Sequence, residues 1–257
     1  MNCKNCDQPL NGNFCANCGQ KADIHRITFK HFLHEFFHAF THTDKGILLL
    51  MKELVTRPGY VAREYLDGQR KKYFNPLSFL VIISSIYAYI SFKSGYFQAL
   101  TEGTKVDMNR SGGGNMKGTI ALLMKESFDL SINHGKVIAL FLTPVLMSFF
   151  SWLFFIRSKN NLSENLVLNS FLLSQINIIM IVIFIPCFLL FPAIPVKLNN
   201  NIFHVLMWIY MTVAYKQFFK NNVFLTAFKS LLIILLFIIF FWLCLFGFVV
   251  VKHLIFG

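Results

Sequence analysis

The sequence predicts an all-α polytopic membrane protein with about five transmembrane helices and a small N-terminal zinc ribbon. Of its 257 residues, 55% are hydrophobic, and the mean hydropathy is +0.55. Soluble domains are less apolar and rarely contain several runs of about 20 uncharged residues. Four cysteines at metal-ligand spacing precede these runs. We therefore expect three domains: a four-cysteine zinc ribbon at 1–22, cytoplasmic or interfacial amphipathic helices with a basic junction at 23–74, and a transmembrane helical bundle at 75–257.

The formal net charge of +12 fits a membrane partner better than a nucleic acid. Lysine and arginine gather in cytoplasmic loops and beside anionic lipid headgroups, and here they flank apolar runs and form no long polar tract. We expect the lipid bilayer as a partner and no nucleic acid. Because no basic stretch followed by a short apolar run comes after Met1, we expect the first span to act as the insertion signal.

The first 22 residues contain Cys3-x-x-Cys6 and Cys15-x-x-Cys18, separated by eight residues. Each such turn directs two thiolates at one point, and two turns complete a tetrahedral shell for zinc. An iron–sulfur cluster, a redox dithiol and disulfides are the alternatives. A closed shell of four ligands indicates a structural metal whose binding supplies folding energy. We expect this ribbon either to bind a cytoplasmic protein partner or simply to cap the N-terminus.

A histidine-rich segment follows, and His34-Glu35-x-x-His38 matches the H-E-x-x-H pattern of zinc hydrolases. In that pattern two helical histidines bind zinc and the glutamate is the general base. A third ligand is needed and no motif supplies it, although Glu53 and Glu64 are possible ligands. We favour an amphipathic interfacial helix with histidines on one face and phenylalanines on the other. Metal binding or pH sensing by the histidine face stays open.

The junction before the first apolar run is strongly basic. Each basic side chain at an anionic surface contributes about 1 kcal/mol, which predicts a membrane-surface anchor. The positive-inside rule places this flank, and the ribbon with it, in the cytoplasm. The anchor residues are Arg57, Arg63, Arg70, Lys71 and Lys72.

The junction also carries a longer pattern, R-P-G-x5-Y-x2-G-x-R-K-K-Y-x2-P, which follows the two cysteine turns and leads into the first span. This arrangement resembles the bacterial membrane proteins grouped as domain of unknown function 3667. The resemblance covers the first third of the chain, and it implies a zinc ribbon, an inner-membrane bundle and a bacterial host without implying a reaction. The matching positions are Arg57, Pro58, Gly59, Tyr65, Gly68, Arg70, Lys71, Lys72, Tyr73 and Pro76.

Five apolar runs are each near the 20 or so residues that cross hydrocarbon. They lie at about 75–92, 136–156, 171–191, 202–219 and 231–251. We expect an external loop at 93–135, with a short amphipathic helix at 119–130. Basic residues flank the loop after the second run and the loop after the fourth. These two loops are therefore expected in the cytoplasm and the C-terminus outside.

None of the predicted spans carries a charged residue at mid-depth, although ion-coupled transporters usually need one. Polar residues there favour hydrogen bonds between helices, with a transport path as the alternative. These residues are Ser84, Ser85, Ser174, Gln175 and Asn177.

Together these features predict a non-enzymatic, multi-pass inner-membrane protein whose cytoplasmic ribbon and interfacial helices recruit or sense a partner. Two alternatives remain: a membrane metallohydrolase built on His34, Glu35 and His38, and a transporter or channel for a small molecule or lipid. An oligomer is possible.

Overall fold

The computed structural model describes residues 1–24, 26–28, 47–102 and 119–256. Apart from two backbone bridges in the ribbon, the regular structure in these ranges is helical. Three helices are long and apolar enough to cross a membrane: Pro76–Lys93, Leu162–Leu190 and Val223–Ile255. The all-α, membrane-type architecture is confirmed. The five predicted spans are not, because only three of the described helices meet both conditions.

Two short helices form the junction. Helix α2 spans Ile47–Thr56 and helix α3 spans Pro58–Asp67. Pro58 occupies the first position of α3, where its missing N–H costs nothing, and Gly68 ends the helix with φ of +120°. Helix α4, Pro76–Lys93, then begins under an Asn75 cap that accepts hydrogen bonds from the N–H groups of residues 77 and 78. The predicted start of the first span at Asn75 is therefore accurate to one residue.

Helix α6 departs from the prediction. It runs without a break over Thr119–Phe154, whereas we expected an external loop to 135 and a separate helix at 119–130. A single glycine at position 135 costs about 1 kcal/mol in a helix, which is too little to end one that is supported along its length. Helix α10, Val223–Phe256, gives that support. Phe128 stacks on Trp242 with ring centroids 6.3 Å apart, and His253 Nε2 lies 3.0 Å from Glu126 Oε1.

The third predicted span also begins earlier than expected. Helix α7, Leu162–Ile179, starts at an Asn161–Glu164 capping box rather than near 171. It continues through a π-helical turn, η3, at Met180–Phe184 into α8 at Ile185–Leu190. Pro186 lacks an N–H and would crowd the carbonyl four residues before it, so a wider turn at this point keeps the helix continuous.

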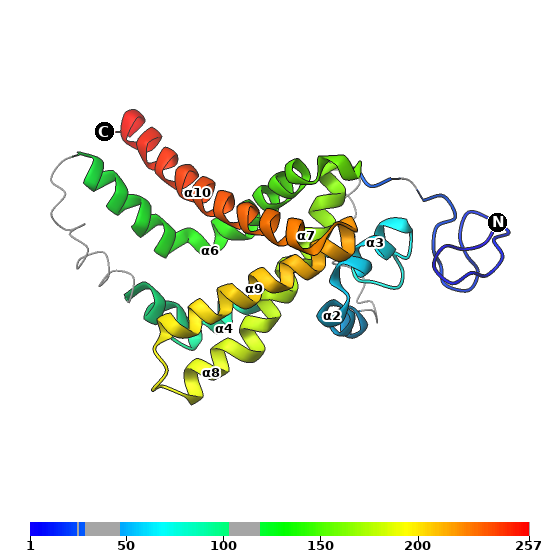
Figure 1. Cartoon of the computed structure of the whole chain (residues 1–257), viewed down its shortest axis with the longest axis horizontal. Coiled ribbons are helices and arrows are strands. Elements are labelled where there is room, and N and C mark those ends of the chain that lie inside the picture. Colours follow the sequence, from blue (N-terminus) through cyan, green and yellow to red (C-terminus); the bar gives the residue numbers. More distant parts are fainter. Residues whose placement is uncertain (25, 29–46, 103–118, 257) are drawn as a thin grey trace.

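Successive long helices run in opposite directions (Figure 1). The ribbon lies at one end, beyond the turns that follow α6 and α9, and the C-terminus lies at the other. Helix α9 covers Val196–Phe219 and ends on Lys220, which adopts a left-handed conformation with φ of 55° and leads into α10. The chain is thus folded back and forth between a ribbon end and a far end.

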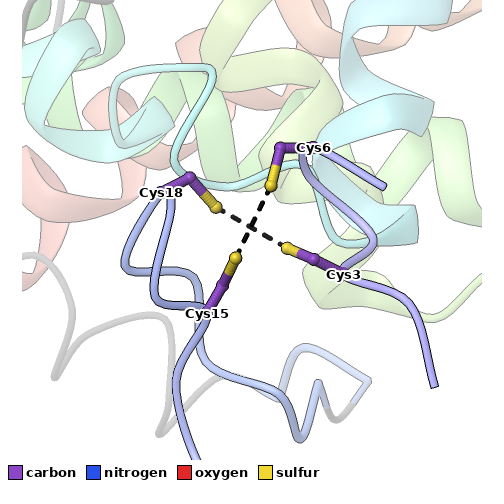
Figure 2. A group of neighbouring side chains, drawn as sticks. All are labelled: Cys3, Cys6, Cys15 and Cys18. Carbon is purple, nitrogen blue, oxygen red and sulfur yellow. Dashed lines mark hydrogen bonds between the residues drawn. The ribbon is translucent and has the colours of Figure 1, made fainter. Parts of the chain in front are cut away.

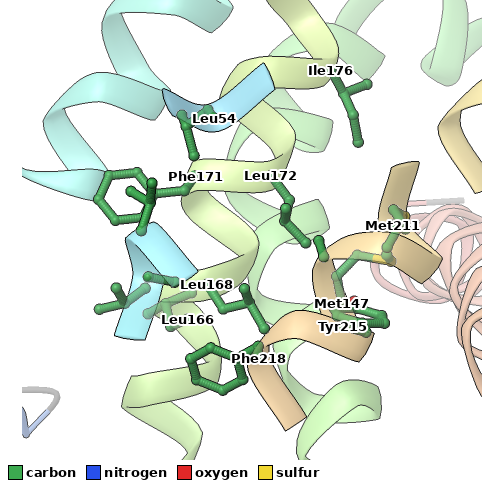
Figure 3. Packing of buried hydrophobic residues seen from close by; sticks show 14 of the residues in the cluster. Leu54, Met147, Leu166, Leu168, Phe171, Leu172, Ile176, Met211, Tyr215 and Phe218 are labelled. Carbon is green, nitrogen blue, oxygen red and sulfur yellow. The ribbon is translucent and has the colours of Figure 1, made fainter. Parts of the chain in front are cut away.

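The largest apolar core lies at the ribbon end, where α2 and α3 pack against α7 and α9 (Figure 3). The Tyr65 and Phe171 rings pack edge to face, with 5.7 Å between centroids and 85° between planes. Gly59 brings α3 so close to α9 that a Cβ there would lie 2.3 Å from the Ala214 carbonyl oxygen. The junction helices are therefore part of the bundle's core and do not lie beside it.

Candidate functional site

Two similar turns build the cysteine site at the N-terminus (Figure 2). In the first, the Cys3 N–H donates to the Gln8 carbonyl at 2.9 Å. In the second, the Cys15 N–H donates to the Gln20 carbonyl at 2.8 Å, and Gly19 has φ of 71°. This left-handed position suits glycine, which has no Cβ to clash. Local hydrogen bonding therefore directs both cysteine pairs towards one point.

The four sulfur atoms of Cys3, Cys6, Cys15 and Cys18 lie within 4.8 Å of one another. The Sγ atoms of Cys3 and Cys18 are 3.6 Å apart, and those of Cys6 and Cys15 are 3.5 Å apart. Disulfide sulfurs would be about 2.05 Å apart, so the cysteines are unpaired. A tetrahedral ion with bonds of about 2.3 Å to sulfur places its ligands about 3.8 Å apart. The donor set fits such a metal ion, and its four ligands leave no position for a substrate.

The thiol protons also suit metal binding. Hydrogen bonds from the Gln8 backbone and then from Asn17 lower the pKa of Cys6 to about 6. Partial burial raises the pKa of Cys18 to about 11. These opposite shifts favour the thiolate at Cys6 and the thiol at Cys18, whose proton would be displaced when a metal cation binds.

The ribbon is attached to the loop between α3 and α4. The Lys71 N–H donates to Gln20 Oε1 at 3.2 Å, and the Lys72 N–H donates to Asn5 Oδ1 at 3.1 Å. Gly68 lies against the ribbon, where an added Cβ would come within 3.1 Å of Lys4 Cδ, and within 2.6 Å of Ile24 Cδ1 just after the ribbon. Both turns of the ribbon therefore hold the basic loop.

A second attachment ties the segment after the ribbon to the start of α7. Arg26 donates to both Glu164 carboxylate oxygens, at 2.5 and 3.0 Å, and to the Lys159 carbonyl at 2.7 Å. The Asn161 amide donates to the Ile27 carbonyl at 3.2 Å, and the Ile27 side chain is buried. The hydrogen bond to Glu164 raises the pKa of Arg26.

Five polar side chains converge inside the junction and form what we call the junction network. Arg57 bridges Glu53 and Glu64 at 2.7 Å to each carboxylate. Lys72 Nζ lies 2.8 Å from Glu64, and the Tyr73 hydroxyl donates to Glu64 at 2.6 Å and also to Glu53. Two cations balance two carboxylates, so the network is neutral overall.

The junction network changes the acidities of its members. Burial raises the pKa of both Glu53 and Glu64, but hydrogen bonds outweigh it and lower both values on balance. The donors are Tyr73 and Arg57 for Glu53, and Lys72, Tyr73 and Arg57 for Glu64. Burial, followed by its bonds to the two carboxylates, raises the pKa of Tyr73. The carboxyls therefore stay ionised and the phenol stays a donor at neutral pH.

Several of the predicted anchor residues have partners within the chain. Arg57 and Lys72 belong to the junction network. Arg63 donates to the Phe218 carbonyl and lies 5.0 Å from the centre of the Phe218 ring. Lys71 is exposed, and Arg70 is half-buried. The anchor role stays a prediction, with Lys71 as its most accessible member.

The H-E-x-x-H residues His34, Glu35 and His38 lie outside the described residues, so the structure does not test the hydrolase alternative. Its possible third ligands, Glu53 and Glu64, are members of the junction network.

Polar residues in the bundle bond between helices. Asn177 Nδ2 of α7 donates to Ser84 Oγ of α4 at 2.8 Å. Gln175 is buried, and its Oε1 has no hydrogen-bond partner among the described residues.

Sequence reasoning missed a larger group near the ribbon end. Asn169 donates to Ser151 Oγ at 3.0 Å and accepts from the Tyr215 hydroxyl at 2.8 Å, while Ser151 Oγ donates to Asn165 Oδ1 at 2.9 Å. The signal was present, because positions 165 and 169 share one helix face. Placing the start of the helix near 171 left them out.

Comparison with known proteins gives one match. Residues 44–88 match the model of a protein family of unknown function, DUF3667. Searches of curated proteins and of solved structures find no match. The matched segment contains the junction network, Gly59, Gly68 and the Asn75 cap, and it includes every residue of the R-P-G to Pro76 pattern. Over residues 44–88, the chain's predicted resemblance to DUF3667 is therefore confirmed.

Proposed function

We propose that this chain is a non-enzymatic integral membrane protein that presents a zinc ribbon to a cytoplasmic protein partner. The observation that carries the proposal is a closed four-cysteine site held by fixed contacts at one end of a membrane-type bundle. A closed shell suits folding and docking rather than catalysis. Zinc is the metal that best fits four thiolates at tetrahedral spacing.

The direction of the helices supports a chain that crosses the bilayer five times. Helices α4, α7–α8 and α10 all run away from the ribbon end (Figure 1). If these three cross, α6 and α9 have to return through the same layer. In α6, the short apolar stretch Leu140–Phe154 would be the part that crosses back through the bilayer.

Charge supports a cytoplasmic ribbon and an external C-terminus. The turns at the ribbon end carry Arg157, Lys159 and Lys220, and the adjacent end of α9 carries Lys216. By the positive-inside rule this end faces the cytoplasm, and the family resemblance indicates a bacterial inner membrane. Exposed Lys71 on the same side would contact anionic headgroups.

The ribbon offers an apolar side chain to a partner. Phe14, next to the ligand Cys15, is 62% exposed. Large aromatic residues are enriched where proteins bind one another.

The test compares proteins cross-linked to tagged full-length chain in cells. Deleting residues 1–22 and the change Phe14→Asp are each expected to remove the same partner, with membrane insertion intact. Phe14→Asp should retain its metal, because Phe14 is not a ligand. An unchanged set of captured proteins in both variants contradicts the proposal.

Metal analysis separates this proposal from the hydrolase. We expect one zinc per purified chain, lost in Cys3→Ser and retained in His34→Ala. Two metals per chain, together with a hydrolytic activity that Glu35→Gln abolishes, would favour the enzyme.

A further inference from the structure

The acceptors that hold the basic loop come from both cysteine turns. Asn5 lies between Cys3 and Cys6, and its Oδ1 accepts from the Lys72 N–H at 3.1 Å. Gln20 follows the second cysteine pair, and its Oε1 accepts from the Lys71 N–H at 3.2 Å. The positions of both acceptors therefore depend on how the four cysteines are held.

We propose that metal binding at the four cysteines closes a clamp on residues 68–72, so that loss of the metal releases this loop. The clamp consists of the Asn5 and Gln20 acceptors and the close contact of the ribbon with Gly68. It adds a metal-controlled conformational change to the proposed function, but it does not depend on a protein partner.

The ribbon has little besides a metal to keep it folded. Cys3 and Cys15 are its buried apolar side chains, at 1% and 3% exposure, whereas Phe14 is exposed. A segment this short cannot bury enough apolar surface to offset its conformational entropy. Metal binding supplies that free energy in small cysteine-ligated domains. Without the metal, the turns that position Asn5 and Gln20 lose their support.

The expected change in the loop is local, because its far end is held separately. The Lys72 ammonium group and the Tyr73 hydroxyl stay bound to Glu64, at 2.8 and 2.6 Å. Opening therefore frees the stretch between Gly68 and Lys72 without separating α3 from α4. The exposed Lys71 lies in this stretch.

Gly68 allows the clamp to be opened without touching a ligand. A Cβ at this position would lie 2.6 Å from Ile24 and 3.1 Å from Lys4, and φ is +120°. The Ile24 methyl group can turn aside, but Lys4 Cβ lies 3.2 Å away and is fixed to the ribbon backbone, so Gly68→Ala should push the ribbon away by a few tenths of an ångström while the cysteine turns stay intact. Gly95→Ala controls for alanine at a positive-φ position without contacts, since φ is +72° and no heavy atom lies within 4 Å of an added Cβ; Asn5→Ala, which changes no glycine, tests the clamp without backbone strain.

The experiment measures amide hydrogen exchange of the peptide covering 69–73 in the purified full-length chain in lipid nanodiscs. Zinc-loaded protein is compared with protein stripped by a chelator. Exchange is expected to become at least about fivefold faster after stripping, which corresponds to one hydrogen bond of about 1 kcal/mol. Peptides from α7 should keep their protection.

Zinc-loaded Gly68→Ala and Asn5→Ala should show the same faster exchange while keeping one zinc per chain, and Gly95→Ala should behave as wild type at 69–73. The inference is overturned if stripping leaves exchange at 69–73 unchanged, or if both zinc-loaded variants remain fully protected. If stripping also exposes α7, the two zinc-loaded variants decide the question. This experiment uses the purified chain without a protein partner. Its result therefore does not depend on whether the cross-linking experiment captures one.

Discussion

The change Gly59→Ala tests whether α3 and α9 pack as closely as the structure indicates. Gly59 is the second residue of α3, and its N–H donates to Gln217 Oε1 at 3.0 Å. A Cβ would lie 2.3 Å from the Ala214 carbonyl oxygen and 2.6 Å from the Phe218 nitrogen. Both neighbours are backbone atoms of α9, so they cannot move aside as a flexible side chain would.

The magnitude follows from opposing effects. Ordinary contact begins near 3.4 Å, so the helices have to separate by about 1 Å, and overpacking of this kind typically costs about 1–3 kcal/mol. Losing the hydrogen bond to Gln217 adds about 1 kcal/mol. The better helix propensity of alanine offsets at most about 1 kcal/mol of this destabilisation. We therefore expect a net destabilisation of about 1–3 kcal/mol.

Thermal unfolding in detergent measures the effect, at about 2–4 °C for each kcal/mol in a chain of this size. Gly247→Ala is the matched control, because Gly247 lies inside α10 with no heavy atom within 4 Å of an added Cβ. The control should be neutral or slightly stabilised. If Gly59→Ala is as stable as Gly247→Ala, α3 and α9 are not packed as described.

Two further predictions concern the polar groups. The pKa values of Glu53 and Glu64 are lowered in the folded state, so their ionised forms stabilise the fold. This contribution should be complete above the unfolded pKa of about 4.3 and should be lost as the pH falls through the folded pKa values. A melting temperature measured from pH 7 down to pH 3 should fall at the acid end, and Glu64→Gln should flatten that fall; an equally steep fall in the variant would contradict the assignment. Asn169→Leu should destabilise the bundle by about 1–2 kcal/mol, because it leaves the Tyr215 hydroxyl and Ser151 without their shared partner. Unfolding in detergent compares this variant with Asn177→Leu, which removes the single bond to Ser84. We expect the larger loss of stability for Asn169→Leu, and equal losses in the two variants would contradict this expectation.

Local signals in the sequence mark the ends of several elements. Asn75 and Pro76 form a cap and a first helical position, and Gly68 supplies a left-handed residue at the end of α3. Each needs only neighbours within a few residues, so each can be recognised in the sequence. The early start of α7 was missed for a different reason. The Asn161–Glu164 capping box was visible in the sequence, but the apolar run that guided the prediction begins later.

The meaning of the basic junction depended on tertiary contacts. Read along the sequence, Arg57 and Lys72 resemble a lipid anchor, because nothing local pairs Lys72 with a carboxylate. The crossing of α2, α3 and the following loop brings Glu53 and Glu64 to both cations. The Glu53–Arg57 pair has local i,i+4 spacing, but the bonds from Arg57 and Lys72 to Glu64 require the helices to be placed first, so charge pattern alone could not predict them.

The sequence by itself determined the cysteine site, the helical membrane-type architecture and the family segment. Each depends on residue spacing or on the length of an apolar run, which are properties of neighbouring residues. Only the tertiary structure decided that the ribbon rests on the loop at 68–72, that Gly59 permits α3 to contact α9, and that Asn169 bonds to Tyr215. These contacts join residues 46 or more positions apart, and the packing of the helices determines which of them form.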